Sequence, residues 1–140
     1  KWEEKMAPAR KLENYTYDDY LEIDRTTKEN ERIELIFGEI YMMAGANAVH
    51  QDVVGNIFFL LRTEDTTRSC KPRIASFDLK LECGDQMNVV QPDVLLYCGD
   101  NTLPCALFEV LSPSTAYRDK GVKKELYEKC RIREYFIVNI

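Results

Sequence analysis

The chain has 140 residues, 45% of them hydrophobic, and its formal net charge is −5. This size and apolar content exclude a disordered tail, and we expect a single globular domain over residues 1–140. No stretch approaches the roughly 20 apolar residues of a membrane span, and the charged start does not resemble a secretory signal. We therefore expect a cytoplasmic protein without a membrane partner. Because the sequence lacks an initial Met and stops directly after an apolar run, truncated termini are compatible with it.

The sequence contains five cysteines, an odd number, and no CxxC pair. The odd count argues against a complete disulfide framework, and the missing CxxC spacing argues against a zinc site. We therefore expect free, buried thiols at Cys70, Cys83, Cys98, Cys105 and Cys130.

The first half of the sequence predicts a helix, a hairpin and a clearer second helix. Residues 16–23 favour a short helix, because Thr16 is a good N-cap and acidic residues follow it in the first turn. Residues 33–43 alternate around Gly38, which is typical of a hairpin. Apolar residues recur at helical spacing from 49 to 61, directly after a run of small residues.

The second half predicts several strands and one more helix, without repeats or an obvious linker. Residues 74–81 alternate as a strand, and apolar runs at 90–96 and 106–111 predict two neighbouring strands. A Ser-Pro-Ser sequence then interrupts the chain before a helix over 116–130. Residues 133–140 complete the pattern as a strand.

Two acidic residues stand inside the neighbouring apolar runs, Asp93 in the first and Glu109 in the second. Strands rich in Val, Leu and Phe are built to be buried, and an ionised carboxylate left there without a partner costs several kcal/mol. A bound divalent cation is one suitable partner.

A lysine of the last predicted helix is expected to point inward. At about 100° per residue, Lys123 falls in the same sector as the apolar stripe of Val122, Leu126 and Cys130. The alternative is a side chain whose ammonium reaches solvent, paired with Asp119 one turn earlier.

Asp93, Glu109 and Lys123 together form the set that metal-dependent phosphodiester cleavage requires. Two carboxylates can hold Mg²⁺ and leave other positions for water and a phosphate oxygen. The metal lowers the pKa of its water, and a lysine can orient the attacking water or stabilise the developing charge. Paired carboxylates also serve glycosidases, but those enzymes do not call for an inward lysine or a basic helix.

The charge is distributed unevenly along the chain. A pI near 5 normally counts against a nucleic-acid partner. However, the segment from Arg118 to Arg133 has seven basic residues against three acidic ones and a local charge of +4. Such a basic strip can dock a phosphate backbone, although a charge run on a helix is more often a solvated face.

The order of these motifs resembles the Uma-type family of restriction-endonuclease-like proteins, within the PD-(D/E)XK nuclease superfamily. The resemblance is carried by Pro92-Asp93, by Glu109-Val110-Leu111-Ser112-Pro113-Ser114, by Asp119 with Lys123 and Tyr127, and by Glu134-Tyr135 with Phe136-Ile137-Val138. Upstream, Glu34-Leu35-Ile36 with Gly38-Glu39-Ile40, and His50 at the start of a helix, extend it to about 110 residues.

The resemblance implies an α/β (α+β) fold with a restriction-endonuclease-like core, in which a central mixed sheet is flanked by helices. It also implies that Asp93 and Glu109 are metal ligands. Where the superfamily motif has a lysine two positions after the glutamate, this chain has Leu111. The family moves that lysine to the following helix, and Lys123 is the matching position, which the helix-face argument selects independently.

Three further residues are weaker candidates. The family pattern suggests Glu39 as an additional metal carboxylate, although acids beside hairpin turns are usually only solvated. His50, the only histidine, is predicted to face the interior, as a core residue or as a phosphate contact or proton shuttle at the cleft. Asp119 is a candidate for a contact with the substrate or the cleft.

These observations predict a Mg²⁺-dependent endodeoxyribonuclease that acts on DNA, with Mn²⁺ as another possible metal. A second reading is a catalytically degenerate module of the same fold that binds nucleic acid or a protein partner. A third is a small-molecule hydrolase, which the acidic pI favours. A homodimer is plausible, because cutting both strands is easier with two sites.

Overall fold

The computed structural model describes residues 14–43, 45–64 and 69–140. The expected single domain over 1–140 includes positions 1–13, 44 and 65–68, which lie outside this description, and it stays a prediction. The helices are α2 (Tyr17–Thr26), α3 (Ala48–Glu64), α4 (Ala116–Lys120) and α5 (Val122–Lys129). The strands are β1 (Arg32–Ile36), β2 (Glu39–Met43), β3 (Cys70–Ile74), β4 (Leu79–Cys83), β5 (Gln86–Val90), β6 (Val94–Cys98), β7 (Ala106–Val110) and β8 (Glu134–Val138).

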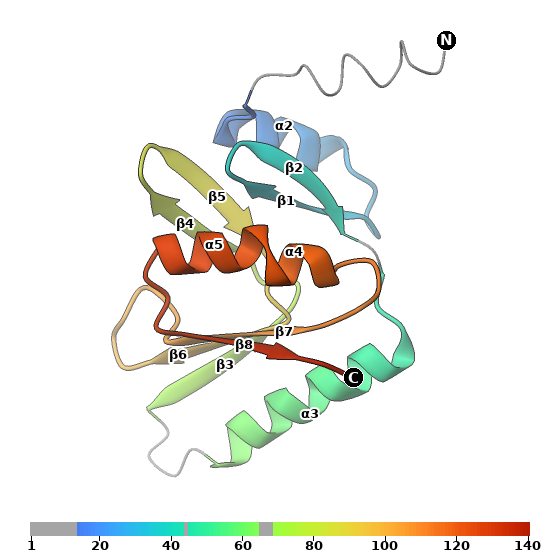
Figure 1. Ribbon diagram of the computed structural model, residues 1–140, viewed down its shortest axis with the longest axis vertical. Coiled ribbons are helices and arrows are strands. Elements are labelled where there is room, and N and C mark those ends of the chain that lie inside the picture. Colours follow the sequence, from blue (N-terminus) through green and yellow to red (C-terminus); the bar gives the residue numbers. More distant parts are fainter. Residues whose placement is uncertain (1–13, 44, 65–68) are drawn as a thin grey trace.

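The strands form two four-stranded sheets (Figure 1). One sheet has the order β2-β1-β5-β4 and is antiparallel throughout. The other has the order β3-β6-β7-β8, and its last pair, β7 and β8, is parallel. The fold is therefore a mixed α/β fold whose second sheet is the expected mixed sheet. The separate antiparallel sheet was not predicted.

The helices cover the sheets on different sides (Figure 1). Helix α2 contacts β1 and β5, whereas α3 contacts β3, β6 and β7. Helices α4 and α5 lie between the two sheets in Figure 1, and α5 contacts β1. The region beneath α4 and α5 is thus bordered by both sheets.

The first helix and the hairpin form as their sequences predicted. Thr16 caps α2 by accepting a hydrogen bond from the N–H of Asp19, whose carboxylate accepts one from the N–H of Thr16. The turn between β1 and β2 has positive φ at both Phe37 and Gly38, which matches the backbone twist of tight hairpins. A Cβ at Gly38 would lie 2.7 Å from Cβ of Asn14, so glycine also permits a close approach.

The strand expected over residues 74–81 is wrong as one element. Its two ends belong to different sheets, because Ile74 is paired with Val94 in β6 and Leu79 is paired with Val90 in β5. The chain passes from one sheet to the other between them, and Ile74 and Phe77, which continue the apolar pattern up to the crossing, are exposed.

The helix expected over residues 116–130 is divided into α4 and α5 at Gly121. A Cβ on this glycine would lie 2.7 Å from the carbonyl oxygen of Tyr117. The predicted inward face is nevertheless present, because Lys123, Leu126 and Tyr127 are buried on α5.

The expectation of free thiols is wrong for four of the five cysteines. Disulfides join Cys70 to Cys98 and Cys83 to Cys130, and Cys105 remains a free thiol. The parity argument failed because an odd number still allows two pairs. Tertiary structure sets the partners: the register of β3 and β6 places Cys70 opposite Cys98.

Strand alternation directs selected acidic side chains toward α5. In β1, Ile33 and Leu35 pack in the cluster beneath α2, so Glu34 and Ile36 face the opposite side. In β7, Leu107 belongs to the core cluster that contains Leu126 of α5. Residue Glu109 shares the face of Leu107 because side chains alternate along a strand.

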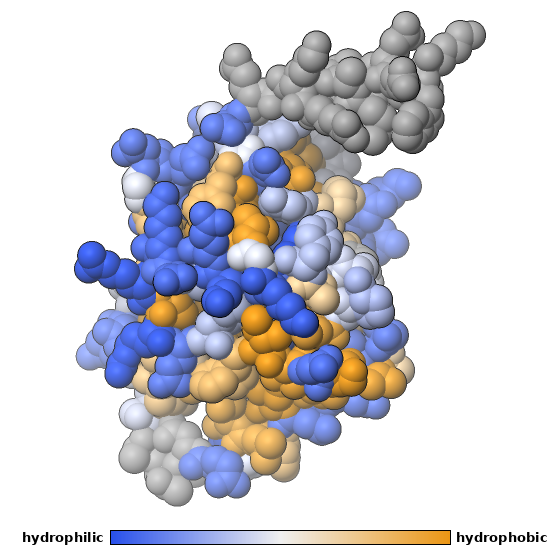
Figure 2. Space-filling model, viewed as in Figure 1, coloured by the Kyte–Doolittle hydropathy of each residue, from blue (hydrophilic) through white to orange (hydrophobic). Residues whose placement is uncertain are grey.

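Among the described residues, no helix is long and apolar enough to cross a membrane. Figure 2 shows apolar side chains gathered on the part of this face where β8 and α3 lie, whereas polar side chains cover much of α5. The exposed apolar residues include Val49 and Phe59 of α3 and Phe136 of β8.

Candidate active site

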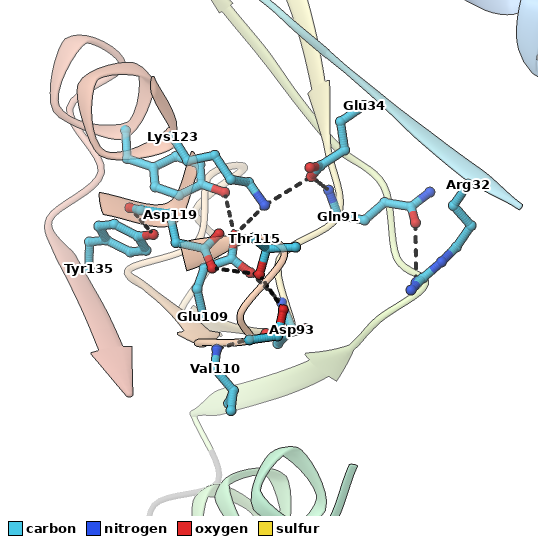
Figure 3. Close-up of polar contacts among 12 residues, drawn as sticks. Arg32, Glu34, Gln91, Asp93, Glu109, Val110, Thr115, Asp119, Lys123 and Tyr135 are labelled. Atoms are coloured by element: carbon cyan, nitrogen blue, oxygen red, sulfur yellow. Dashed lines mark hydrogen bonds and ion pairs between the residues drawn. The ribbon is translucent and has the colours of Figure 1, made fainter. Parts of the chain in front are cut away.

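The two carboxylates singled out by the sequence come together at the start of β6 and the end of β7. The N–H of Asp93 donates to Oε1 of Glu109 (3.0 Å), and the N–H of Val110 donates to Oδ2 of Asp93 (2.7 Å). Each carboxylate thus holds the backbone of the other segment (Figure 3). The antiparallel pairing of β6 with β7 creates this arrangement.

Lys123 points inward from α5, as the helix-face argument expected. Its side chain is 3% exposed, and its ammonium forms ion pairs with Glu109 and with Glu34, the latter at 3.0 Å (Figure 3). The alternative, an ammonium in solvent paired with Asp119, is not what the structure shows. A lysine with two buried carboxylates as partners stays charged.

Sequence reasoning missed Glu34 as a site residue. It is 1% exposed, and besides Lys123 it accepts a hydrogen bond from the N–H of Gln91 (2.8 Å). Its signal was available in the sequence, because Glu34 stands between Ile33 and Leu35 just as Asp93 and Glu109 stand in apolar runs.

Further groups fix Glu109 and Asp119 in place. The hydroxyl of Tyr127 donates to Oε2 of Glu109 (3.3 Å), and burial raises the pKa of Tyr127 well above its usual value, so this hydroxyl stays protonated. Asp119 is 4% exposed, and its carboxylate accepts from the hydroxyl of Thr115 (3.3 Å). The hydroxyl of Tyr135 donates to the backbone oxygen of Asp119 (2.8 Å).

His50 lies against Asp93, at the N-terminal end of α3. Its Nε2 is 3.0 Å from the carbonyl oxygen of Val110 and 3.3 Å from Oδ2 of Asp93. Because both of these atoms are acceptors, Nε2 must carry a proton. The other ring nitrogen, Nδ1, is buried and has no hydrogen-bond partner in the part of the chain that the structure describes.

The structure does not bring Glu39 to this group. Its side chain is exposed at the start of β2 and accepts a hydrogen bond from the hydroxyl of Tyr41 (2.9 Å). It is not among the residues that line the cleft. In the hairpin register Glu39 is opposite Ile36, two positions along β1 from Glu34.

The site opens into a cleft of about 210 Å³. Three elements of its wall are the loop before α3, the Ser112–Thr115 segment and the inner face of α4 and α5. Its charged and titratable lining residues are Arg32, Glu34, His50, Asp93, Glu109, Arg118, Asp119 and Lys123.

Burial and mutual repulsion disfavour the charged forms of these carboxylates. Burial raises the pKa of Asp93 and of Asp119, and it raises the pKa of Glu109 to about 8, while the ammonium of Lys123 opposes the shift in each case. Burial alone would lower the pKa of Lys123, but Glu109 and Glu34 raise it above its usual value. The site therefore gathers several carboxyl groups around one ammonium and favours the protonated form of some of them.

Asp93 and Glu109 are the residues that could hold a metal ion. In the described ranges, no group of three or more His, Cys, Asp or Glu side chains has an arrangement suited to a metal. Mg²⁺ usually takes only one or two protein carboxylates and completes its octahedron with water and substrate phosphate. A pair of carboxylates beside an open cleft fits this ion, whereas structural zinc requires four protein ligands.

The basic strip is weaker at the surface than its sequence suggests. Two of its seven basic residues, Arg118 and Lys123, are buried in the cleft. The remaining five are exposed: Lys120, Lys124, Lys129, Arg131 and Arg133. The strip is thus divided between the site and the solvent.

The sequence matches the family model Uma2, described as "Putative restriction endonuclease", over residues 17–140. Two proteins of Synechocystis sp. (strain ATCC 27184 / PCC 6803 / Kazusa) are similar to it. "Uncharacterized protein slr1290" is 28% identical over 142 residues, which cover 95% of this chain and 73% of the relative. "Uncharacterized protein sll1609" is 30% identical over 128 residues, which cover 84% and 71%.

Proposed function

We propose that this chain, which belongs to the Uma2 family, is a Mg²⁺-dependent endonuclease that hydrolyses phosphodiester bonds of DNA. The family match supports a nuclease-like fold. The observation that carries the proposal is the pairing of Asp93 with Glu109 in one cleft, with the ammonium of Lys123 held against Glu109.

In this proposal Asp93 and Glu109 hold the metal, with Mn²⁺ as a substitute. A metal held by these residues would polarise a phosphate oxygen and lower the pKa of its water. The backbone hydrogen bonds between the two segments fix both carboxylates before substrate arrives. Nε2 of His50 donates to the carbonyl oxygen of Val110 and lies 3.3 Å from Oδ2 of Asp93, so His50 acts as a positioning residue.

Lys123 is placed to stabilise charge that develops during hydrolysis. As the oxygen of a water molecule bonds to phosphorus and one P–O ester bond breaks, negative charge grows on the phosphate oxygens and on the leaving oxygen. An ammonium fixed by Glu34 and Glu109 meets that charge without reorganising. The attacking water loses its proton to solvent, and the leaving oxygen takes up a proton.

Cleavage and metal binding test the proposal together. Calorimetric titration of Mg²⁺ and Mn²⁺ into the protein, and into Asp93→Asn, is followed by incubation of both with linear and circular DNA in the same buffers. We expect metal binding and nicking in the parent protein, and neither in the variant. Circular DNA identifies an endonuclease, because only internal cleavage can relax or linearise it.

The alternative reading predicts a different result in the same experiment. A degenerate module of this fold would bind DNA or a protein partner without binding metal. If the parent protein binds no divalent cation even when DNA is present, the nuclease proposal is wrong and the binding module takes its place. Nicking by Asp93→Asn at the parental rate would indicate a contaminating nuclease.

A further inference from the structure

A guanidinium that forms no ion pair within the described part of the chain lies in the wall of the cleft. Arg118 of α4 is 6% exposed and lines the cleft together with Asp93 and Glu109. Its Nε is buried and has no hydrogen-bond partner among residues 14–43, 45–64 and 69–140. Within the same ranges, none of the carboxylates forms a salt bridge with Arg118.

This state is unusual, because arginine is almost never buried unless it is paired. The other basic groups of the cleft are engaged. Lys123 forms ion pairs with Glu34 and Glu109. Arg32 donates to the hydroxyl of Ser76 (2.7 Å) and to the side-chain oxygen of Gln91 (3.4 Å). Arg118 is therefore the basic group of this lining whose donors are not used by the described residues.

Two aromatic rings hold the guanidinium in place. The carbon Cζ of Arg118 lies 5.4 Å from the ring centroid of Tyr41 and 5.9 Å from that of Tyr117. Contacts with ring faces occupy the plane of a guanidinium and leave its edge, which carries the N–H groups, available to an acceptor. Preorganisation of this kind lowers the entropy that ligand binding costs.

Three hydroxyl groups lie together in the neighbouring segment of the cleft wall. The hydroxyl oxygen of Ser112 is 2.8 Å from that of Thr115 and 3.3 Å from that of Ser114. All three residues line the same cleft as Arg118. The hydroxyls of Ser112 and Ser114 can rotate to donate to an oxygen of a bound anion, whereas that of Thr115 donates to Asp119.

We propose that Arg118 is a phosphate-binding residue that receives a backbone phosphate of a nucleic acid beside the Asp93–Glu109 pair. The planar fork of arginine matches two phosphate oxygens, and the adjacent hydroxyls can satisfy a third. A phosphate that approaches four carboxylates needs a cation that is not already neutralised, and Arg118, which forms no salt bridge within the described residues, provides it. The inference rests on the proposed function only in taking a nucleic acid as the source of the phosphate.

The first test observes Arg118 directly. In a ¹H–¹⁵N spectrum of the arginine side chains, the buried Nε–H signal of Arg118 is assigned by triple-resonance experiments on the parent protein. Inorganic phosphate and a short DNA duplex are then titrated separately, in EDTA. We expect both to shift this signal. A shift with inorganic phosphate but not with DNA would indicate a site for free anions and overturn the nucleic acid as the source of the phosphate. No shift with either probe would overturn the inference, and this result does not depend on whether the variants fold.

The second test measures DNA binding as a function of salt, again in EDTA. Arg118→Gln should weaken binding about tenfold and reduce the slope of log K against log salt by about 1. Arg118→Lys should restore part of the affinity, because it keeps the charge but not the fork. Arg62→Gln removes an exposed arginine of α3 outside the cleft and should bind like the parent protein.

The outcomes separate this inference from the proposed nuclease activity. If Arg118→Gln binds DNA with the affinity of the parent protein, and Asp93→Asn has lost nicking, the nuclease proposal is supported and the role of Arg118 is overturned. Loss of binding in Arg118→Gln, with no nicking by the parent protein in Mg²⁺, would support the role of Arg118 and overturn the nuclease. A thermal melt of each variant shows whether lost binding reflects unfolding.

Discussion

The ammonium of Lys123 lies 3.0 Å from the carboxylate of Glu34, so α5 of the site is joined by an ion pair to β1 of the antiparallel sheet. The same ammonium is paired with Glu109 of the mixed sheet. One buried lysine therefore connects the two sheets at the floor of the cleft. All three side chains are at most 3% exposed.

Removal of this ammonium should strongly destabilise the fold. Lys123→Met leaves two carboxylates buried without their partner, and breaking such a pair costs about 3 to 5 kcal/mol. Urea denaturation measures this change in the free energy of unfolding. Glu34→Gln combined with Lys123→Met should be less destabilising than the two single effects added together, because the pair is coupled.

Lys124→Met is the matched control for Lys123→Met. Lys124 is the next residue of α5, and its side chain is exposed. Its replacement should change the free energy of unfolding by no more than about 0.5 kcal/mol. Equal effects of the two substitutions would contradict the structural role of Lys123.

Asp93→Asn should separate stability from metal binding. Burial raises the pKa of Asp93 more than its partners lower it, so the ionised form is disfavoured in the folded protein. An amide has a similar shape, and its oxygen can still accept from the N–H of Val110. We expect a melting temperature equal to or above that of the parent protein in EDTA, together with loss of Mg²⁺ binding. A large fall in melting temperature would contradict this account.

Glu109 should make the metal-free protein less stable as pH rises. Its pKa is about 8 in the folded protein against an ordinary value of 4.5, mainly because of burial. The folded state therefore binds the proton more tightly than the unfolded state does, and this contribution to stability is lost between those two pH values. Melting curves in EDTA should show a smaller decrease for Glu109→Gln than for the parent protein.

Mg²⁺ should counteract this pH dependence. A bound divalent cation favours ionised carboxylates, so its apparent affinity should rise as pH rises from about 6 to 8 while protons compete less for Asp93 and Glu109. Calorimetry across this range measures the trend. An affinity that is independent of pH would indicate that these two carboxylates are not the ligands.

His50→Ala should weaken the site without disrupting the core. The side chain donates to the carbonyl oxygen of Val110 and lies against Asp93, and loss of such a positioning partner typically reduces metal affinity by about 10 to 100 times. His50→Gln, whose amide can still donate, should recover part of the affinity. Metal titrations of both variants measure the effect, and parental affinity in His50→Ala would exclude the positioning role.

The fold could be predicted from sequence wherever local pattern and tertiary structure agree. The capped helix after Thr16, the Phe37–Gly38 hairpin and the strand around Glu109 follow from short-range periodicity. The strand expected over residues 90–96 is wrong as one element, because Val90 ends β5 in the antiparallel sheet and Val94 begins β6 in the mixed sheet. Prediction failed between Ile74 and Leu79, because alternation reports burial on one face and does not identify the sheet to which a strand belongs. The disulfides were not predicted for a similar reason, because the number of cysteines says nothing about the distances between them in the fold.

The sequence by itself indicated that Glu109 and Lys123 lie in the interior and Asp93 beside them, because charges within apolar runs and on an apolar helix face need partners, but it did not single out Glu34. Only the tertiary structure decided which residues are the partners of these charged side chains. Glu34 meets Lys123, Glu39 remains in solvent, and Arg118 has no ion partner among the described residues, because two sheets and α5 converge there. Such contacts join positions far apart in the chain, and local periodicity extends over only a few residues.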